Sequence, residues 1–233
     1  MSKLTTIAFD ADDTLWHNER HFKFTQAMFV ELLGDTAEPD HILARLQVAE
    51  RKNLKFYGFG IKGFTLSMIE TAIEVTGGNV DTKTIAKLLD QGREMLQHPV
   101  ELLPGARETV QQLNTDYKLL LITKGDLFDQ ERKVAASGLS DFFHGVEIVS
   151  DKTSEVYDRI FKYYSSSAKQ GLMAGNSLKS DVIPMLKAGG YGVHIPHELF
   201  WEFENDEAPT GHLRFFTIEK IDEIVKLANM LPT

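Results

Sequence analysis

The sequence contains no cysteine among its 233 residues. This absence excludes disulfide-stapled scaffolds, zinc sites built on thiolates and cysteine nucleophiles, and it suits a reducing compartment. No apolar run approaches the roughly 20 residues that a membrane-spanning helix needs. The first residues also lack the pattern of a signal sequence. We therefore expect a soluble, cytoplasmic protein that does not associate with a membrane.

Basic residues are outnumbered by acidic ones, with 25 Lys and Arg against 34 Asp and Glu and a net charge of −9. A surface with this balance repels polyanions, so nucleic acid is not an expected partner. The composition is otherwise that of a globular protein, which excludes a disordered or low-complexity chain. A chain of this length buries enough surface to fold without a structural metal.

Hydrophobic spacing divides the chain into segments of different character. Apolar residues recur every three or four positions from about 18 to 98, which predicts helices, and Asp40, Thr65 and Asp81 are candidate caps. Before and after this stretch the pattern is that of short strands, and the later strands alternate with helices. The sequence thus predicts α/β alternation with a helical insert after the first strand. Strands are expected at 4–9, 118–122, 146–149, 172–174 and 192–195, and helices at 106–113, 127–137, 156–164, 180–188 and 218–231.

Polar clusters follow four of the predicted strands. In open parallel sheets the functional residues lie at the carboxyl ends of the strands, so these clusters are expected to meet at one edge. The clusters are Asp10-Ala11-Asp12-Asp13-Thr14, Thr123-Lys124-Gly125-Asp126, Asp151-Lys152, and Gly175-Asn176-Ser177 with Asp181.

The first cluster holds three carboxylates within four residues, Asp10, Asp12 and Asp13. Such groups repel one another in a cleft unless a cation or different protonation states separate them. Mg²⁺ suits hard oxygen ligands and leaves positions for phosphate oxygens, which implies a phosphorylated substrate. One carboxylate can then attack phosphorus while the next but one acts as general acid and base. Thr123 and Lys152 would stabilise the phosphoryl oxygens during transfer.

These clusters resemble, in order, the four motifs of the haloacid dehalogenase-like (HAD) superfamily of aspartate-nucleophile phosphohydrolases. The motifs are a hydrophobic strand followed by D-x-D-x-T, a strand ending in Ser or Thr, a lysine, and a G-D-x-x-x-x-D pattern followed by a helix. Thr153 and Glu155 stand where prolines are common, and Asn176 stands where many members have Asp. The resemblance covers the whole chain. The matching segments are Ile7–Leu15, Leu120–Thr123, Lys152 and Gly175–Asp181.

The resemblance assigns a role to each matching residue. It implies that Asp10 forms an aspartyl-phosphate and that Asp12 protonates the leaving group and then activates water. Thr123 and Lys152 would hold the phosphoryl oxygens, with Lys124 a further candidate for substrate binding. An Asp two residues after the nucleophile favours a phosphatase over a dehalogenase, because a leaving halide needs no proton.

The resemblance also implies a Mg²⁺ site. Its ligands would come from Asp10, the backbone carbonyl of Asp12, Asp181 and Asn176. An amide oxygen can bind a hard cation, but Asn176 brings one negative charge less than Asp. The sequence therefore predicts weaker Mg²⁺ binding than a fully acidic site would show.

Together these features predict a doubly wound parallel sheet with an inserted all-helical cap domain. The α/β catalytic core would comprise residues 1–16 and 101–233, and the cap residues 17–100. The predicted function is Mg²⁺-dependent hydrolysis of a small phosphorylated metabolite. Two alternatives remain open: a phosphotransferase or mutase that uses the same intermediate, and a non-catalytic module that binds a phosphometabolite.

Two other patterns are weaker. Residues 58–63 satisfy G-x-G-x-x-G, but no strand precedes them, so a cap loop is expected rather than a dinucleotide site. His17 and His21, and likewise His194 and His197, are close in sequence. Neither pair has the third ligand that a zinc site needs.

Overall fold

The computed structural model describes residues 3–164 and 167–231 of the chain. The chain divides into two compact units. We call the first the α/β unit, formed by Met1–Glu19, Val100–Lys124 and Gln130–Thr233. The second, the helical unit, is formed by Arg20–Pro99 and Gly125–Asp129.

The α/β unit is built on a six-stranded sheet in the order β3-β2-β1-β4-β5-β6, in which every pair is parallel. The central strand β1 lies between β2 and β4, so the chain winds outward in both directions from it. Such a switch point opens a crevice at the carboxyl ends of the strands. The strands are β1 (Thr6–Phe9), β2 (Lys118–Lys124), β3 (Gly145–Val149), β4 (Gly171–Gly175), β5 (Tyr191–His194) and β6 (Phe215–Thr217).

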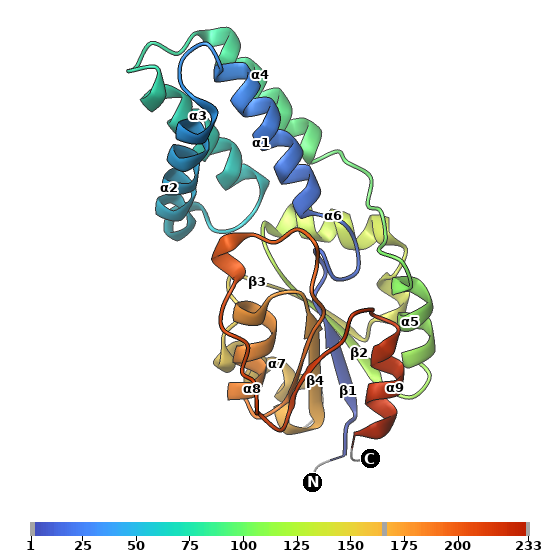
Figure 1. Ribbon diagram of the computed structural model, residues 1–233. Helices are drawn as coiled ribbons and strands as arrows, with labels where there is room; N and C mark the ends of the chain where they lie inside the picture. Colours follow the sequence, from blue (N-terminus) through green and yellow to red (C-terminus); the bar gives the residue numbers. More distant parts are fainter. Residues whose placement is uncertain (1–2, 165–166, 232–233) are drawn as a thin grey trace. The chain divides into compact units, whose positions relative to one another are not determined.

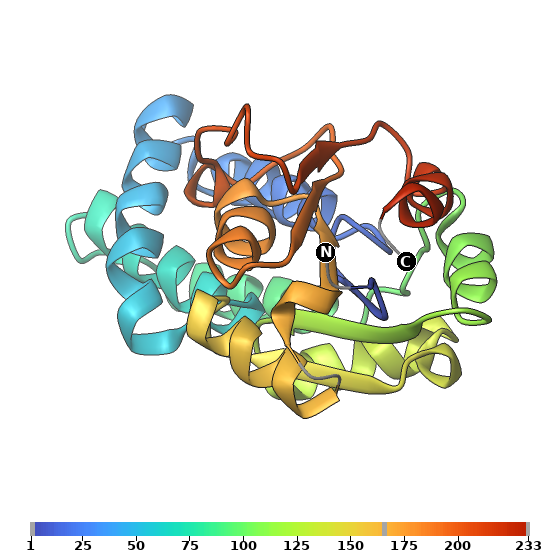
Figure 2. The same cartoon turned by 90° about the horizontal axis from the view of Figure 1, so that it is seen from below.

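Helices cover both faces of this sheet. Alternate residues of β1 enter different clusters: Ile7 and Phe9 join one hydrophobic core, and Ala8 joins the other. The first core is closed by α5 (Ala106–Leu113) and α9 (Glu223–Met230), the second by α7 (Ser154–Tyr164) and α8 (Ile183–Lys187). Figures 1 and 2 show these pairs of helices on opposite sides of the strands. The predicted doubly wound fold is therefore confirmed.

The helical unit contains a core of its own, around Phe29, Leu46, Met68 and Leu88. Each of these residues comes from a different helix, so the four helices pack through one apolar centre. The helices that contribute them are α1 (Glu19–Leu33), α2 (Pro39–Tyr57), α3 (Ile61–Val75) and α4 (Thr82–Met95).

Helix capping in this unit was predicted correctly at one position of three. The carboxylate of Asp81 accepts hydrogen bonds from the N–H groups of Lys83 and Thr84 and caps α4. Asp40 and Thr65 lie inside α2 and α3 instead. Glu38 occupies the N-cap position of α2, two residues before Asp40, because Pro39 can stand in the first turn, where its missing N–H costs nothing.

Three further details differ from the sequence prediction. Strand β6 was missed, because its three residues form a partly exposed edge without a long apolar run. The predicted helix 180–188 is split into a π-helical turn, η3 (Leu178–Val182), and α8, while the last helix is shorter than 218–231. Residues 58–63 follow α2 rather than a strand, as expected. Across the described residues, no helix combines the length and apolar character that crossing a bilayer requires.

Candidate active site

Parallel pairing brings the polar clusters to one edge of the sheet in the α/β unit. Phe9, the last residue of β1, is in register with Leu121 of β2 and Ala174 of β4. The N–H of Asp10 extends this pairing by donating to the carbonyl of Ala174, at 2.9 Å. Thr123 lies on the same edge and is buried. The predicted convergence of strand ends is therefore present in the structure.

Lys152 lies between two carboxylates at this edge. Its Nζ donates to Oδ1 of Asp10 at 2.5 Å and to Oδ1 of Asp181 at 2.7 Å, with all three side chains largely buried. One ammonium cannot neutralise two carboxylates. Burial and the charge of Asp181 together raise the pKa of Asp10 to about 7, against the opposing effect of Lys152. Burial disfavours the ammonium, but the two carboxylates outweigh it and raise the pKa of Lys152. The site thus carries uncompensated negative charge.

Asp181 is fully buried and both of its oxygens are engaged. Besides the bond from Lys152, its Oδ2 accepts a hydrogen bond from the N–H of Ser177 at 3.0 Å. A Cβ at Gly175 would lie 2.2 Å from this oxygen, so the strand end needs glycine at that position. The structure therefore places Asp181, a predicted metal ligand, in direct contact with Lys152.

Asn176 lies where a cation site was predicted. The end of its side-chain amide is 3.2 Å from Oδ2 of Asp10 and 3.3 Å from the backbone carbonyl oxygen of Asp12. With its nitrogen turned inward, the amide donates to both oxygens. With its oxygen turned inward, three oxygens face one another, which is a donor set that suits Mg²⁺.

This set depends on an amide and a carbonyl, because within the described ranges no three His, Cys, Asp or Glu side chains are grouped to hold a metal. The residues present, together with the uncompensated charge of Asp10 and Asp181, fit a hard divalent cation.

Asp12 is held by three side chains that the sequence analysis did not single out. Lys133 donates to both carboxylate oxygens at 2.7 Å, Gln130 donates to Oδ2 at 2.8 Å and the indole of Trp16 to Oδ1 at 2.7 Å. Burial alone would raise the pKa of Asp12. The charge of Lys133 and the hydrogen bonds from Lys133, Gln130 and Trp16 outweigh burial and lower this pKa. Asp10 and Asp12, the two catalytic candidates that follow β1, therefore have opposite pKa shifts. The sequence carried one signal of this: Gln130 and Lys133 are three apart on a predicted helix and so share a face.

Lys124 pairs with a residue far away in sequence. Its Nζ donates to Oε1 of Glu204 at 2.5 Å and to Oγ of Ser180 at 2.7 Å. The other oxygen of Glu204 accepts from the hydroxyls of Ser177 and Ser180. Glu204 belongs to the short helix η4 (Glu202–Glu204), and no motif marked it. Lys124 thus links β2 to this turn, and its role toward substrate stays a prediction.

The third carboxylate of the first cluster, that of Asp13, forms hydrogen bonds with the backbone. Asp13 has a φ of 58°, in the left-handed region, where no other non-glycine residue of the described chain lies. Its side chain accepts hydrogen bonds from the N–H groups of Asn18 and Glu19. Burial raises the pKa of Asp13 to about 6. Asp13 thereby fixes the turn that leads from β1 to α1.

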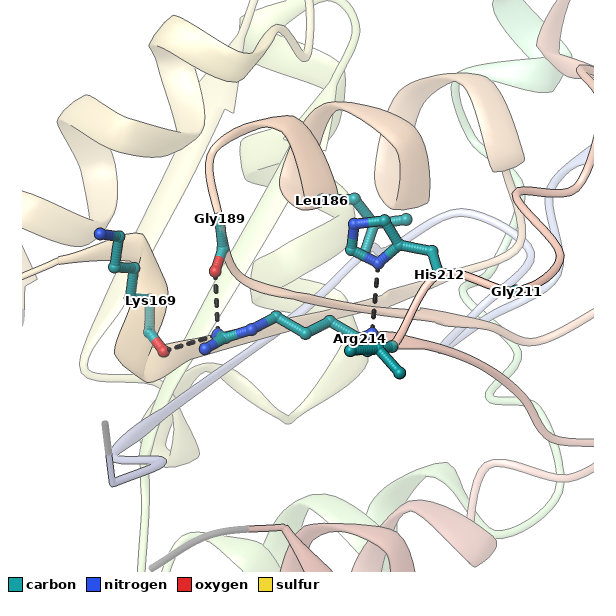
Figure 3. Close-up of a pocket in the computed structure, with 7 residues that line it drawn as sticks. Lys169, Leu186, Gly189, Gly211, His212 and Arg214 are labelled. Atoms are coloured by element: carbon teal, nitrogen blue, oxygen red, sulfur yellow. Dashed lines mark hydrogen bonds between the residues drawn. The ribbon is translucent and has the colours of Figure 1, made fainter. Parts of the chain in front are cut away.

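A separate cavity of about 600 Å³ lies elsewhere in the α/β unit (Figure 3). The guanidinium of Arg214 donates to the carbonyls of Lys169 and Gly189 at 3.1 and 2.9 Å and lies over the ring of Tyr191. The guanidinium is therefore held by contacts within the fold. The lining residues, none of them a predicted site residue, are Lys169, Leu186, Gly189, Gly211, His212, Leu213 and Arg214.

Comparisons with known proteins agree with this fold. A solved haloacid dehalogenase-like family hydrolase from Xanthomonas campestris is 36% identical, with a TM-score of 0.85 over 97% of this chain and 96% of that one. A putative HAD-hydrolase from Bacillus subtilis, solved bound to magnesium, shares the fold at 17% identity, with a TM-score of 0.66 over 98% of this chain and all of that one. N-acylneuraminate-9-phosphatase of Mus musculus is 24% identical over 203 residues, 81% of each chain.

The parallel core, with an aspartate directly after its central strand, is the α/β arrangement that the sequence motifs predicted. A family model described as haloacid dehalogenase-like hydrolase matches residues 4–190. The chain belongs to this family, as the sequence motifs predicted.

Proposed function

We propose that the protein is a Mg²⁺-dependent phosphatase that hydrolyses a small phosphomonoester through an aspartyl-phosphate on Asp10. The observation that carries this proposal is the arrangement of Asp10, Lys152 and Asp181, a buried carboxylate paired with an ammonium at the switch point of the sheet. The similarity to N-acylneuraminate-9-phosphatase supports phosphate monoesters as the substrate class.

The residues of the chain supply each step of such a reaction. A carboxylate oxygen of Asp10 attacks phosphorus, and the bond from phosphorus to the leaving oxygen breaks. Asp12 gives that oxygen its proton, then takes a proton from the water that attacks the aspartyl-phosphate. Inorganic phosphate leaves and Asp12 is protonated again. Lys152 and Thr123 stabilise the phosphoryl oxygens, and Lys152 also lowers the repulsion between the Asp10 carboxylate and the anionic substrate.

We propose that Asp10, the carbonyl of Asp12 and Asn176 hold Mg²⁺ directly, whereas Asp181 acts at the site through Lys152. When bound, the ion would offset the negative charge of the carboxylates and the phosphate. The magnesium-bound Bacillus subtilis structure supports this choice of cation for the fold.

We propose that the predicted cap, residues 17–100, selects the leaving group and closes over it. The separate core of the helical unit supports this role, because a unit that packs independently can move as a body. Closure would exclude bulk water and leave room for small substrates only, such as a phosphorylated sugar acid.

The test is phosphate release from a panel of phosphomonoesters, with and without Mg²⁺. The panel contains N-acetylneuraminate 9-phosphate, phosphoglycolate, hexose phosphates and nucleoside monophosphates. We expect Mg²⁺-dependent turnover that falls at least about 10³-fold in Asp10→Asn, because the nucleophile is lost. Asp158→Asn, an exposed carboxylate on α7, is the matched control and should keep full activity.

Turnover that survives in Asp10→Asn, or a folded native protein inactive on the whole panel, would refute the proposal. Product analysis with an added alcohol acceptor distinguishes hydrolysis from phosphotransfer.

A further inference from the structure

An ion pair crosses the carboxyl edge of the sheet beside the candidate site. Lys124 ends β2, and its Nζ donates to Oε1 of Glu204 at 2.5 Å and to Oγ of Ser180 at 2.7 Å. Ser180 follows β4, and β2 and β4 flank β1 on opposite sides, so the side chain of Lys124 spans the position of β1 at this edge. The pair therefore lies at the crevice that holds Asp10, the proposed nucleophile.

A single serine separates Glu204 from the buried carboxylates of the site. The hydroxyl of Ser177 donates to Oε2 of Glu204 at 2.8 Å, and the N–H of the same residue donates to Oδ2 of Asp181 at 3.0 Å. Asp181 in turn accepts a hydrogen bond from Lys152, which also donates to Asp10. Glu204 is thus close enough for its charge to act on a phosphate ester bound at Asp10.

Lys124 and Glu204 cancel each other's charge. Their side chains are 13% and 17% exposed, so water screens these charges weakly. Burial alone would raise the pKa of Glu204. The charge of Lys124 and the hydrogen bonds from Lys124, Ser180 and Ser177 outweigh burial and lower this pKa, so the carboxylate is ionised at neutral pH. An unpaired ammonium at this position would attract an acidic group near the phosphate, and an unpaired carboxylate would repel it. The pair does neither.

We propose that Glu204 is a specificity-determining residue. By neutralising Lys124, it fits the crevice to phosphomonoesters whose leaving group carries no second acidic group close to the phosphate. This inference rests on the proposed phosphatase function and narrows its substrate class. A sugar phosphate suits such a crevice, and so does a sugar acid whose carboxylate is many bonds from the phosphate. Phosphoglycolate, whose carboxylate is attached to the ester carbon, does not.

Two small phosphates of nearly equal size isolate the effect of this charge. Phosphoglycolate carries a carboxylate where hydroxyethyl phosphate carries a primary alcohol. Each is tested at low ionic strength and fixed free Mg²⁺ as a competitive inhibitor of the panel substrate that the native protein hydrolyses fastest, followed through the alcohol product of that substrate. An inhibition constant is then obtained whether or not either compound is hydrolysed. It does not depend on the fraction of folded protein, so a variant that folds poorly remains informative.

The quantity compared is the inhibition constant of hydroxyethyl phosphate divided by that of phosphoglycolate. We expect the native protein to bind phosphoglycolate no more tightly than hydroxyethyl phosphate. Glu204→Gln keeps the shape and leaves the ammonium uncompensated, so it should raise the ratio at least about fivefold. Lys124→Met leaves the carboxylate uncompensated and should lower the ratio, and the double variant should return it close to the native value. Glu202→Gln, at an exposed residue of the same short helix η4, removes an equal charge and is the control that leaves the ratio unchanged.

Opposite shifts in the two single variants, both smaller in high salt, support the inference. Equal weakening of the two inhibitors in both variants would mean that the pair is only structural. Equal weakening in Lys124→Met alone would mean that this lysine binds the phosphate itself. Either result overturns the inference, and so does a native protein that prefers phosphoglycolate. A native protein without Mg²⁺-dependent turnover on any panel compound is a separate result, which would overturn the phosphatase proposal and this inference together.

Discussion

The two units of the chain differ in how exposed their ion-paired lysines are. In the α/β unit, Lys152 is 2% exposed and is wedged between carboxylates at the end of the sheet. In the helical unit, Lys52 and Lys62 form their ion pairs at the surface, with Glu70 and Asp126, and are more than half exposed. The helical unit buries an apolar core, whereas the α/β unit also buries ionised groups at a cost in desolvation. These ion pairs therefore lie in a buried site in one unit and at the surface in the other.

Among the changes that test this difference between the units, Lys152→Met is expected to have the largest effect on stability. It would leave Asp10 and Asp181 facing each other without a cation in a buried site. We expect a loss of about 3–5 kcal/mol in the free energy of unfolding, the range for a buried pair that loses one partner. Urea unfolding in metal-free buffer measures it. A loss below about 1 kcal/mol would mean that the site is far better hydrated than its burial indicates.

A change of pH is expected to have an intermediate effect on the free energy of unfolding. The pKa of Asp10 is raised from 3.8 to about 7, so the folded state binds this proton more tightly than the unfolded chain does. Its contribution to stability is complete below about pH 4 and is lost as the pH rises toward 7. The unfolding free energy of the native protein minus that of Asp10→Asn should therefore decline across this interval.

Asp12→Asn supplies the comparison, because the pKa of Asp12 is lowered and its contribution changes only at more acidic pH. The corresponding difference for Asp12→Asn should be flat from about pH 5 to 7 and fall only below this range. Parallel slopes for the two variants would contradict the opposite shifts of the two carboxylates.

The smallest effect is expected from Lys52→Met in the helical unit. Its ion pair with Glu70 is largely solvated, and exposed pairs contribute about 0–1 kcal/mol. The change in unfolding free energy should stay below about 1 kcal/mol and shrink further in high salt, measured by the same urea titration as Lys152→Met. A loss as large as that of Lys152→Met would remove the distinction between the two units.

Much of this arrangement was predictable from sequence. The strands of the sheet were marked by apolar runs that stop at polar clusters, and a parallel sheet gathers such clusters at one edge. That rule predicts that Asp10 lies beside the end of β4, and the hydrogen bond from its N–H to the carbonyl of Ala174 agrees with it. The burial of Lys152 does not follow from this rule, because β3 is only partly buried and Asp151 is exposed.

The supporting residues could not be predicted in this way. Lys133 sits on an amphipathic helix, where most lysines are solvated, and only the packing of α6 (Leu127–Ser137) shows that this one is buried. Glu204 meets Lys124 across 80 residues, from a turn without any periodic pattern. Burial and long-range pairing belong to the folded state, so spacing in the sequence carries little trace of them.

The central position of β1 has a consequence for the order in which the chain is made. Thr6 pairs with Lys118 and with Gly171, so the strand that precedes Asp10 finds its first partner only after Lys118 has been made and its second only after Gly171. The helical unit, by contrast, draws nearly all its contacts from one continuous stretch, Arg20–Pro99, and is ready to fold first. A chain interrupted before β4 contains Asp10, the proposed nucleophile, but neither Asn176 nor Asp181. Unfinished copies of the protein are therefore expected to be inert toward phosphate esters.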